Sequence, residues 1–255
     1  MLVVTSGILL HTTKYADTSV IAKIFTREVG LHSYMVKGVR GGKSHVKQNL
    51  LQPMSYLDLV VYNNPNKQIN HIKEIHSHPV EIHRDNTGIC EDRHNYDPTL
   101  RNAIIFFINE VAYKVLKDEE VNIPYFDYIT SVLEQLRREE EGKKPLNPHL
   151  PILFLLETSL HLGLYPQDNY SCREPFFDKQ EGRFVGCTSE TTLDAAESMH
   201  LHQYLTHTPH PSVTLSDRTR IINSLLDYFQ IHLDSFRNFK SHEILHDLLN
   251  SHNVK

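Results

Sequence analysis

The stretch that decides the fold of the first part of this chain is Val20-Ile21-Ala22-Lys23-Ile24-Phe25-Thr26-Arg27. Val20, Ala22, Ile24 and Thr26 occupy one set of alternating positions, and the two cations of the stretch occupy the other. Successive side chains of a β-strand point to opposite faces. The pattern therefore predicts a strand that carries Lys23 and Arg27 on the same face.

Four more short runs of β-branched and apolar residues surround this strand. They comprise residues 2–12, 31–36, 54–62 and 69–75. Turn residues separate them, most clearly Asn63-Asn64-Pro65-Asn66, and the longest connection follows the third run. Five short strands with this spacing predict a small closed β-barrel of the OB type, over residues 1–79.

After Pro79 the apolar spacing changes from two to about three and a half residues, which indicates helices. Asp97-Pro98 is a favourable helix start, residues 150–162 are apolar on nearly every face, and Ser216 is a candidate cap for a long helix. Helices are also predicted over 125–140, 188–205 and 244–249. The fold class is therefore α+β: an N-terminal five-stranded OB-fold β-barrel followed by an all-helical C-terminal domain, residues 80–255, with one irregular insertion at 166–187.

Charge is divided unequally between these two parts. Residues 1–79 hold nine Lys or Arg and four Asp or Glu, a net of +5, whereas the whole chain of 255 residues carries −5. A basic N-terminal part followed by an acidic remainder suggests two surfaces that bind two kinds of partner. No secretory signal and no membrane-spanning run is apparent, and three scattered cysteines are too few for a disulfide framework, so we expect a cytoplasmic protein with free thiols.

The basic residues of the first part are concentrated between positions 14 and 47, a segment of 34 residues with only two acids, Asp17 and Glu28. Glycines within the loop Lys37-Gly38-Val39-Arg40-Gly41-Gly42-Lys43-Ser44 allow close approach to a phosphate backbone. Aromatic residues interleaved with cations can stack on bases. The predicted DNA-binding residues are Lys14, Lys23, Arg27, Tyr34, Lys37, Arg40, Lys43 and Lys47.

Enzymatic chemistry has weaker support in the sequence. Gly42-Lys43-Ser44 ends like a nucleotide-binding P-loop, but that motif requires glycine at the position of Lys37. Histidines gather at 71–83 and again at 200–210, without the usual zinc spacings to cysteine. No nucleophile motif occurs. We therefore expect no catalytic residues, no metal and no cofactor.

Several short motifs, taken in order, resemble the RecO family of bacterial recombination mediators and DNA repair proteins. The resemblance covers essentially the whole length. The motifs are Gly7 to Ser19, Phe25 to Leu31, Val36 to Arg40, Leu51-Gln52-Pro53, Phe154 to Pro166 and Phe239 to Leu245. Each motif is short, and their order and spacing carry the resemblance.

The resemblance implies a function without enzymatic turnover. Members of that family bind and anneal single- and double-stranded DNA and, with RecR, load RecA onto DNA coated by single-strand-binding protein, whose acidic C-terminal tail contacts the helical domain. The implied partners are thus DNA, RecR, single-strand-binding protein and, indirectly, RecA, at the nucleoid and without a membrane. Many members carry a four-cysteine zinc module, whereas residues 166–187 hold only Cys172 and Cys187. We expect a metal-free loop in its place.

Two other functions stay open at this point. An RNA-binding OB protein with a helical interaction domain would share the same basic barrel. A metal-dependent hydrolase would use the histidine clusters instead.

Overall fold

The computed structural model describes residues 1–39, 48–64, 66–78, 97–142, 144–206 and 213–242. Contacts within the chain divide it into two compact units. Unit 1 comprises Met1–Tyr96 and Leu116–Leu146, and unit 2 comprises Asp97–Val115 and Asn147–Lys255. None of the helices within the described ranges is long and apolar enough to cross a membrane.

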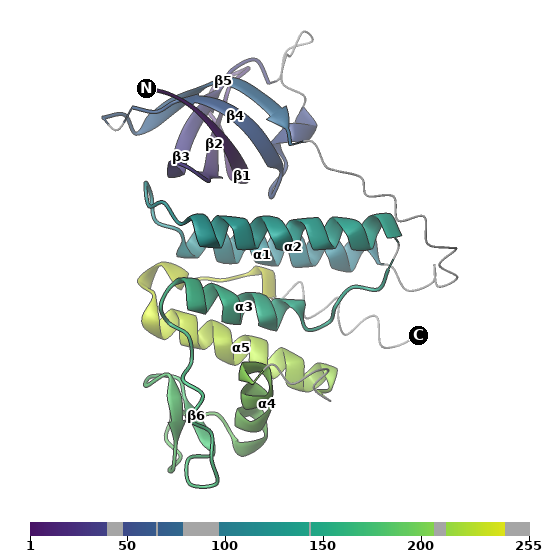
Figure 1. Ribbon diagram of the computed structural model, residues 1–255, viewed down its shortest axis with the longest axis vertical. Coiled ribbons are helices and arrows are strands. Elements are labelled where there is room, and N and C mark those ends of the chain that lie inside the picture. Colours follow the sequence, from purple (N-terminus) through teal and green to yellow (C-terminus); the bar gives the residue numbers. More distant parts are fainter. Residues whose placement is uncertain (40–47, 65, 79–96, 143, 207–212, 243–255) are drawn as a thin grey trace. The chain divides into compact units, whose positions relative to one another are not determined.

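Unit 1 contains a closed five-stranded barrel (Figure 1). Its strands are β1 (Leu2–Lys14), β2 (Val20–Thr26), β3 (Gly30–Val36), β4 (Tyr56–Tyr62) and β5 (Ile69–Ser77), and a short 3-10 helix, η1 (Gln48–Leu51), precedes β4. The order around the barrel is β1-β2-β3-β5-β4. The β3–β5 pair is parallel and the other four pairs are antiparallel. The predicted OB-type barrel is confirmed.

The long strand β1 closes the barrel because it pairs on both sides. Its first half, from Leu2 to Ile8, pairs with β4, and Gly7 to Lys14 pairs with β2 across an irregularity between Leu9 and His11. A Cβ atom at Gly7 would lie 2.7 Å from the side chains of both Ile24 and Leu59. A larger residue at position 7 would force these two buried side chains to move, so the crowded barrel interior favours glycine here.

Helix α2 (Ile123–Gly142) belongs to the barrel unit, although the sequence placed every helix beyond residue 80 in a second domain. Phe126 of α2 packs edge-on against Phe25 of β2, with ring centroids 5.4 Å apart, and against Tyr56 of β4 at 6.1 Å. The preceding segment is hydrogen-bonded to β3, since the Glu119 N–H donates to the Leu31 carbonyl at 2.9 Å. Both Phe25 and Phe126 are buried. The face of β2 that carries Lys23, Phe25 and Arg27 is thus covered by this helix at Phe25.

Unit 2 contains the helices α1 (Pro98–Val115), α3 (Leu150–His161), α4 (Ala195–Leu205) and α5 (Leu215–His232), and the short η2 (Asp234–Phe236). The predicted start at Asp97 is confirmed, because its Oδ1 accepts a hydrogen bond from the Thr99 N–H at 2.8 Å. The predicted cap Ser216 is wrong: Thr214 caps α5 and accepts from the Asp217 N–H. Helix α4 begins at the cap Asp194 rather than near 188. The predicted helix at 244–249 lies outside the described residues.

The insertion predicted as irregular contains a short antiparallel hairpin, β6 (Phe176–Asp178) and β7 (Arg183–Val185). The predicted α+β fold class is confirmed, and the insertion differs from the prediction, because it holds this hairpin instead of an irregular loop. Asp178, at the end of β6, accepts hydrogen bonds from the N–H groups of Gln180 and Glu181 and from the hydroxyls of Ser189 and Thr191, at 2.8–3.2 Å. Burial raises the pKa of Asp178, and these hydrogen bonds outweigh burial and hold its pKa below the usual value.

Candidate nucleic-acid interface

The structure separates the predicted DNA-binding residues into groups with different surroundings. Lys14, at the end of β1, and Lys37, directly after β3, have exposed side chains. Arg40, Lys43 and Lys47 lie outside the described residues, so the centre of the basic glycine loop stays a prediction.

Lys23 and Arg27 are paired with carboxylates from the 116–146 segment. The Lys23 ammonium lies 2.7 Å from Asp118, and the Arg27 guanidinium donates two parallel hydrogen bonds to Asp127 at 2.8 and 2.9 Å. The hydrogen bond to Asp127 raises the pKa of Arg27, and the same bond lowers the pKa of Asp127. The prediction put both cations on one face, but it did not foresee that their charge is largely compensated within unit 1.

Removing these two acids offers a test of whether the paired cations can reach DNA. The double variant Asp118→Asn, Asp127→Asn is expected to bind single-stranded DNA a few-fold more tightly and to steepen the dependence of log K on log salt by about 1.4, because each of the two released cations adds a phosphate contact worth about 0.7. Fluorescence anisotropy with a labelled oligonucleotide over a salt series measures both quantities. The control Glu190→Gln, Asp234→Asn changes the net charge equally on exposed sites of unit 2. An equal gain in DNA affinity in the control variant would show that the change in net charge alone causes the effect.

Tyr34 does not belong to an exposed nucleic-acid surface. Its side chain is fully buried among the apolar residues of the barrel interior, and burial raises its pKa to about 12. Its β3 neighbours His32 and Val36 are buried as well, whereas Ser33 and Met35 are partly exposed. The prediction that Tyr34 stacks on bases is therefore corrected: it is a core residue, as the alternation along β3 requires.

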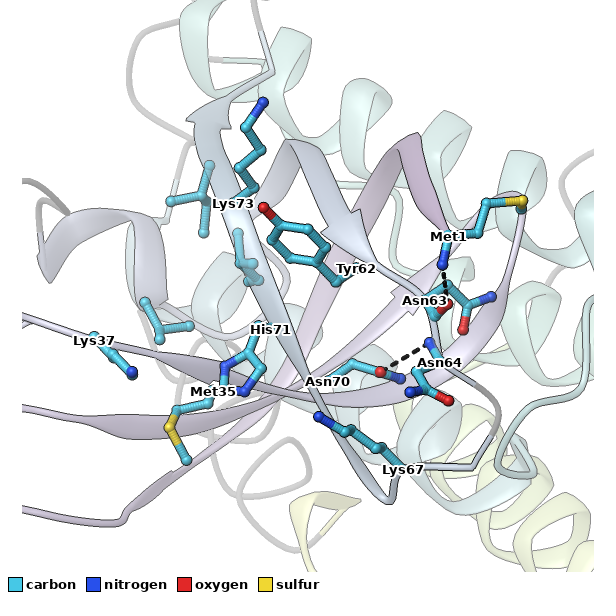
Figure 2. Close-up of a pocket in the computed structure, with 13 residues that line it drawn as sticks. Met1, Met35, Lys37, Tyr62, Asn63, Asn64, Lys67, Asn70, His71 and Lys73 are labelled. Carbon is cyan, nitrogen blue, oxygen red and sulfur yellow. Dashed lines mark hydrogen bonds between the residues drawn. The ribbon is translucent and has the colours of Figure 1, made fainter.

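A groove opens along the seam between β3 and β5 and is shown in Figure 2. The two strands pair over only three residues, from Ser33 with Ile69 to Met35 with His71, before β3 ends at Val36. Residues from the end of β3, the β4–β5 turn and β5 line a volume of about 730 Å³. We call it the seam groove. Its size falls within the roughly 300–1,000 Å³ that is usual for ligand sites.

The seam groove is cationic. Lys37, Lys67 and Lys73 line it, and in the view of Figure 2 they approach from different sides. No Asp or Glu occurs among the described residues of its lining. Lys73 lies 3.3 Å from Glu74, but both side chains are about half exposed, so solvent screens this pair. The groove can therefore attract a polyanion.

Aromatic rings also border the seam groove, at positions that the sequence analysis did not select. Tyr62, at the end of β4, is 49% exposed and pairs in register with His71 of β5. The signal that could have found Tyr62 is the alternation along β4, where Leu57, Leu59 and Val61 are buried. Tyr62 falls on the opposite face, which is available for stacking.

The histidine clusters take part in pairwise contacts within each unit. His78 Nδ1 lies 2.7 Å from Asp58, and His202 Nδ1 lies 2.7 Å from Asp168 with its ring stacked on Tyr170. His83, His207 and His210 lie outside the described residues. Among the residues that the structure describes, no group of three or more His, Cys, Asp or Glu side chains is placed to hold a metal ion.

The donor set of the 166–187 insertion does not fit the zinc module that the resemblance implies. Cys172 and Cys187 are both free and exposed, while a structural zinc site takes four ligands in a tetrahedron. Hydrogen bonds stabilise the insertion instead. Asp178 accepts those of the β6–β7 turn, and the Asn169 side-chain amide donates to Glu174 and to the Phe184 carbonyl, each at 2.9 Å.

Comparison with known proteins gives matches over nearly the whole chain. Residues 1–78 match the family model described as Recombination protein O N terminal, and residues 99–241 match Recombination protein O C terminal. Three curated relatives bear the name DNA repair protein RecO: those of Phocaeicola vulgatus (32% identity), Bacteroides fragilis (29%) and Flavobacterium psychrophilum (27%). Each alignment covers 97% of this chain and 99% of the relative.

Proposed function

Because the chain belongs to the recombination protein O family of DNA repair proteins, we propose that it is a non-enzymatic mediator of recombinational repair whose barrel binds DNA. In this role it anneals complementary strands and, with RecR, helps to load RecA onto DNA coated by single-strand-binding protein. The family membership supports a role in recombinational repair. The finer steps are the proposal.

The observation that carries DNA binding is the composition of the seam groove. Three lysines line it, its described lining holds no carboxylate, and a half-exposed tyrosine borders it. Single-strand-binding OB folds combine such a positive groove with aromatic side chains. Lys14 and the loop residues Arg40, Lys43 and Lys47 are further DNA-binding residues in our proposal, on the strength of their charge in the sequence.

Unit 2 has the opposite character and suits protein partners rather than DNA. Unit 2, residues 97–115 and 147–255, holds ten Lys or Arg and fifteen Asp or Glu, a net charge of −5, so its surface repels a polyanionic strand on balance. We assign to it the contacts with RecR and with the acidic tail of single-strand-binding protein. A pull-down with single-strand-binding protein, with and without its tail, tests this assignment.

The direct test of DNA binding replaces Lys37, Lys67 and Lys73 together by alanine. The variant is expected to lose about tenfold or more in affinity at low salt, and the slope of log K against log salt should become shallower by about 2, since each phosphate contact on a single strand contributes about 0.7. Anisotropy titrations of a labelled oligothymidylate at several salt concentrations give both numbers.

The matched control is Lys117→Ala, Lys144→Ala, Lys240→Ala, which removes the same charge from exposed sites outside the groove. Its salt slope should stay within experimental error of the unmodified protein. If both triple variants lose affinity equally, the groove is not the binding site. A protein that binds no DNA at all would overturn the proposed function itself.

A further inference from the structure

Cys172 lies in a tight turn of the insertion, between Ser171 and Glu174. The Glu174 N–H donates to the Ser171 carbonyl at 3.1 Å, and the Ser171 N–H donates to the Glu174 carbonyl at 3.3 Å. These two hydrogen bonds close a turn of four residues whose central positions are Cys172 and Arg173. The backbone of Cys172 is therefore fixed by its neighbours, while its thiol is exposed.

Cys187 comes two residues after the end of β7, and the pairing of β7 with β6 leads to the same turn. Phe176 of β6 lies opposite Val185 of β7 in an antiparallel register. When this register is extended by two residues, Cys187 is opposite Glu174. The thiol of Cys187 is also exposed.

The segment that precedes the turn lies beside β7 as well and runs parallel to it. Gln167 forms a parallel bridge with Arg183. Two residues later, the Asn169 side chain accepts from the Phe184 N–H at 2.8 Å and donates to its carbonyl at 2.9 Å, so the segment still follows β7 there. Extending the parallel register to Ser171 reaches the second cysteine. Two independent registers therefore align that cysteine with the two ends of the turn.

A close backbone contact shows that the turn crosses the end of β7. A Cβ atom at Gly186 would lie 2.7 Å from the Arg173 carbonyl oxygen, and glycine permits this approach because it has no Cβ. Gly186 directly precedes Cys187, and Arg173 directly follows Cys172. Each cysteine is thus one residue, about 3.8 Å along the chain, from the same contact.

We infer that Cys172 and Cys187 are a redox-active pair that forms a reversible disulfide when the protein meets a peroxide. A disulfide requires Cα atoms about 4.4–6.8 Å apart, which is similar to the separation of residues paired on neighbouring strands. Both thiols are free and exposed, so a small oxidant can reach them. The bond would join the crossing turn covalently to the end of β7.

The reaction consumes one hydrogen peroxide per disulfide. The thiolate of one cysteine attacks a peroxide oxygen, so that an S–O bond forms, the O–O bond breaks, and a sulfenic acid and one water result. The second thiolate then attacks the sulfenic sulfur, the S–S bond forms, and the hydroxyl group leaves as a second water. The two sulfurs lose two electrons, which reduce the peroxide, and an added dithiol returns them.

The test treats the dilute purified chain with about one equivalent of hydrogen peroxide and then blocks the remaining thiols with iodoacetamide. After digestion without reduction, mass spectrometry should find the peptides of Cys172 and Cys187 joined, with two hydrogen atoms fewer than their sum. The two free thiols should be lost together, and dithiothreitol should restore both. Amides of β6 and β7 should exchange hydrogen more slowly in the oxidised protein, because the bond restrains local opening.

Two variants distinguish a pair from two separate thiols. In Cys187→Ser the first thiol has no resolving partner, so Cys172 should accumulate as a sulfenic acid that dimedone traps. Serine replaces cysteine at an exposed position, so this variant should fold normally. Cys90, the third cysteine, lies outside the described residues, and Cys90→Ala should form the same disulfide in the same yield.

Three results would overturn the inference. They are independent oxidation of Cys172 and Cys187 to sulfinic acids, pairing of either with Cys90 or with a second copy of the chain, and survival of both free thiols under peroxide. None of these results bears on DNA binding by the barrel, because both cysteines belong to unit 2.

Discussion

Replacing Phe126 by alanine is expected to destabilise the barrel unit by about 3–5 kcal/mol, the usual cost of truncating a fully buried phenylalanine. Phe126 is 1% exposed and contacts the rings of Phe25 and Tyr56, which belong to two different strands. Truncation leaves a cavity that the barrel cannot close, because β2 and β4 are fixed by their hydrogen bonds to β1. Denaturant unfolding measures the free-energy change.

Hydrogen exchange followed by mass spectrometry locates that effect. If α2 belongs with the barrel, the amides of β2 and β4 should lose protection in Phe126→Ala. The sequence-based boundary near residue 80 instead predicts loss of protection in the helices of unit 2. Phe106→Ala serves as the control, because Phe106 of α1 is 53% exposed and its truncation should cost well under 1 kcal/mol. Unchanged exchange in the barrel would contradict the assignment of α2.

Replacing Asp178 by alanine is expected to destabilise unit 2 by about 2–4 kcal/mol, because four donors lose a charged acceptor at once. Asp178→Asn keeps one carbonyl acceptor, so its free energy of unfolding should lie between those of the unmodified protein and Asp178→Ala. The control Asp234→Ala removes a fully exposed carboxylate and should stay within about 0.5 kcal/mol. Thermal and denaturant unfolding give the comparison, and a cost below that of the control would show that these hydrogen bonds do not maintain the hairpin.

The same carboxylate predicts a dependence on pH. Its pKa in the folded state is lower than in the unfolded chain, so the unfolded chain binds the proton more readily. Its contribution is fully present above the unfolded pKa, about 4, and is lost as pH falls through the lowered folded pKa. Between neutral pH and pH 5 the difference between the unmodified protein and Asp178→Ala should stay constant, and it should shrink below about pH 4.

Much of the fold could be predicted because its signals are local. The alternation in Val20–Thr26, the Asn63-Asn64 turn and the Asp97-Pro98 cap each act over a few residues, and the structure contains the predicted strands and this helix start. The cap of α5 was misplaced by two residues, from Thr214 to Ser216, because both side chains are good caps and the choice depends on where the chain enters the helix.

The candidate site was harder to predict. A count of cations selected Lys23 and Arg27, but it could not show that acids of the 116–146 segment face them. A count of aromatic residues selected Tyr34, although the alternation along β3 already favoured the interior for it and the alternation along β4 favoured the surface for Tyr62. Checking which face of its strand each aromatic residue occupies would have excluded Tyr34 and selected Tyr62.

The sequence by itself determined the family, the OB-type barrel and the basic character of residues 1–79. The alternation of strand residues, the residue types of the turns and the net charge all depend on residues close together in the sequence. Only the tertiary structure decided which cations of the barrel are paired with carboxylates. Arg27 meets Asp127 from 100 positions away, and the seam groove exists because β3 and β5 pair over only three residues. Such contacts depend on how distant segments meet in space, and no local pattern encodes them.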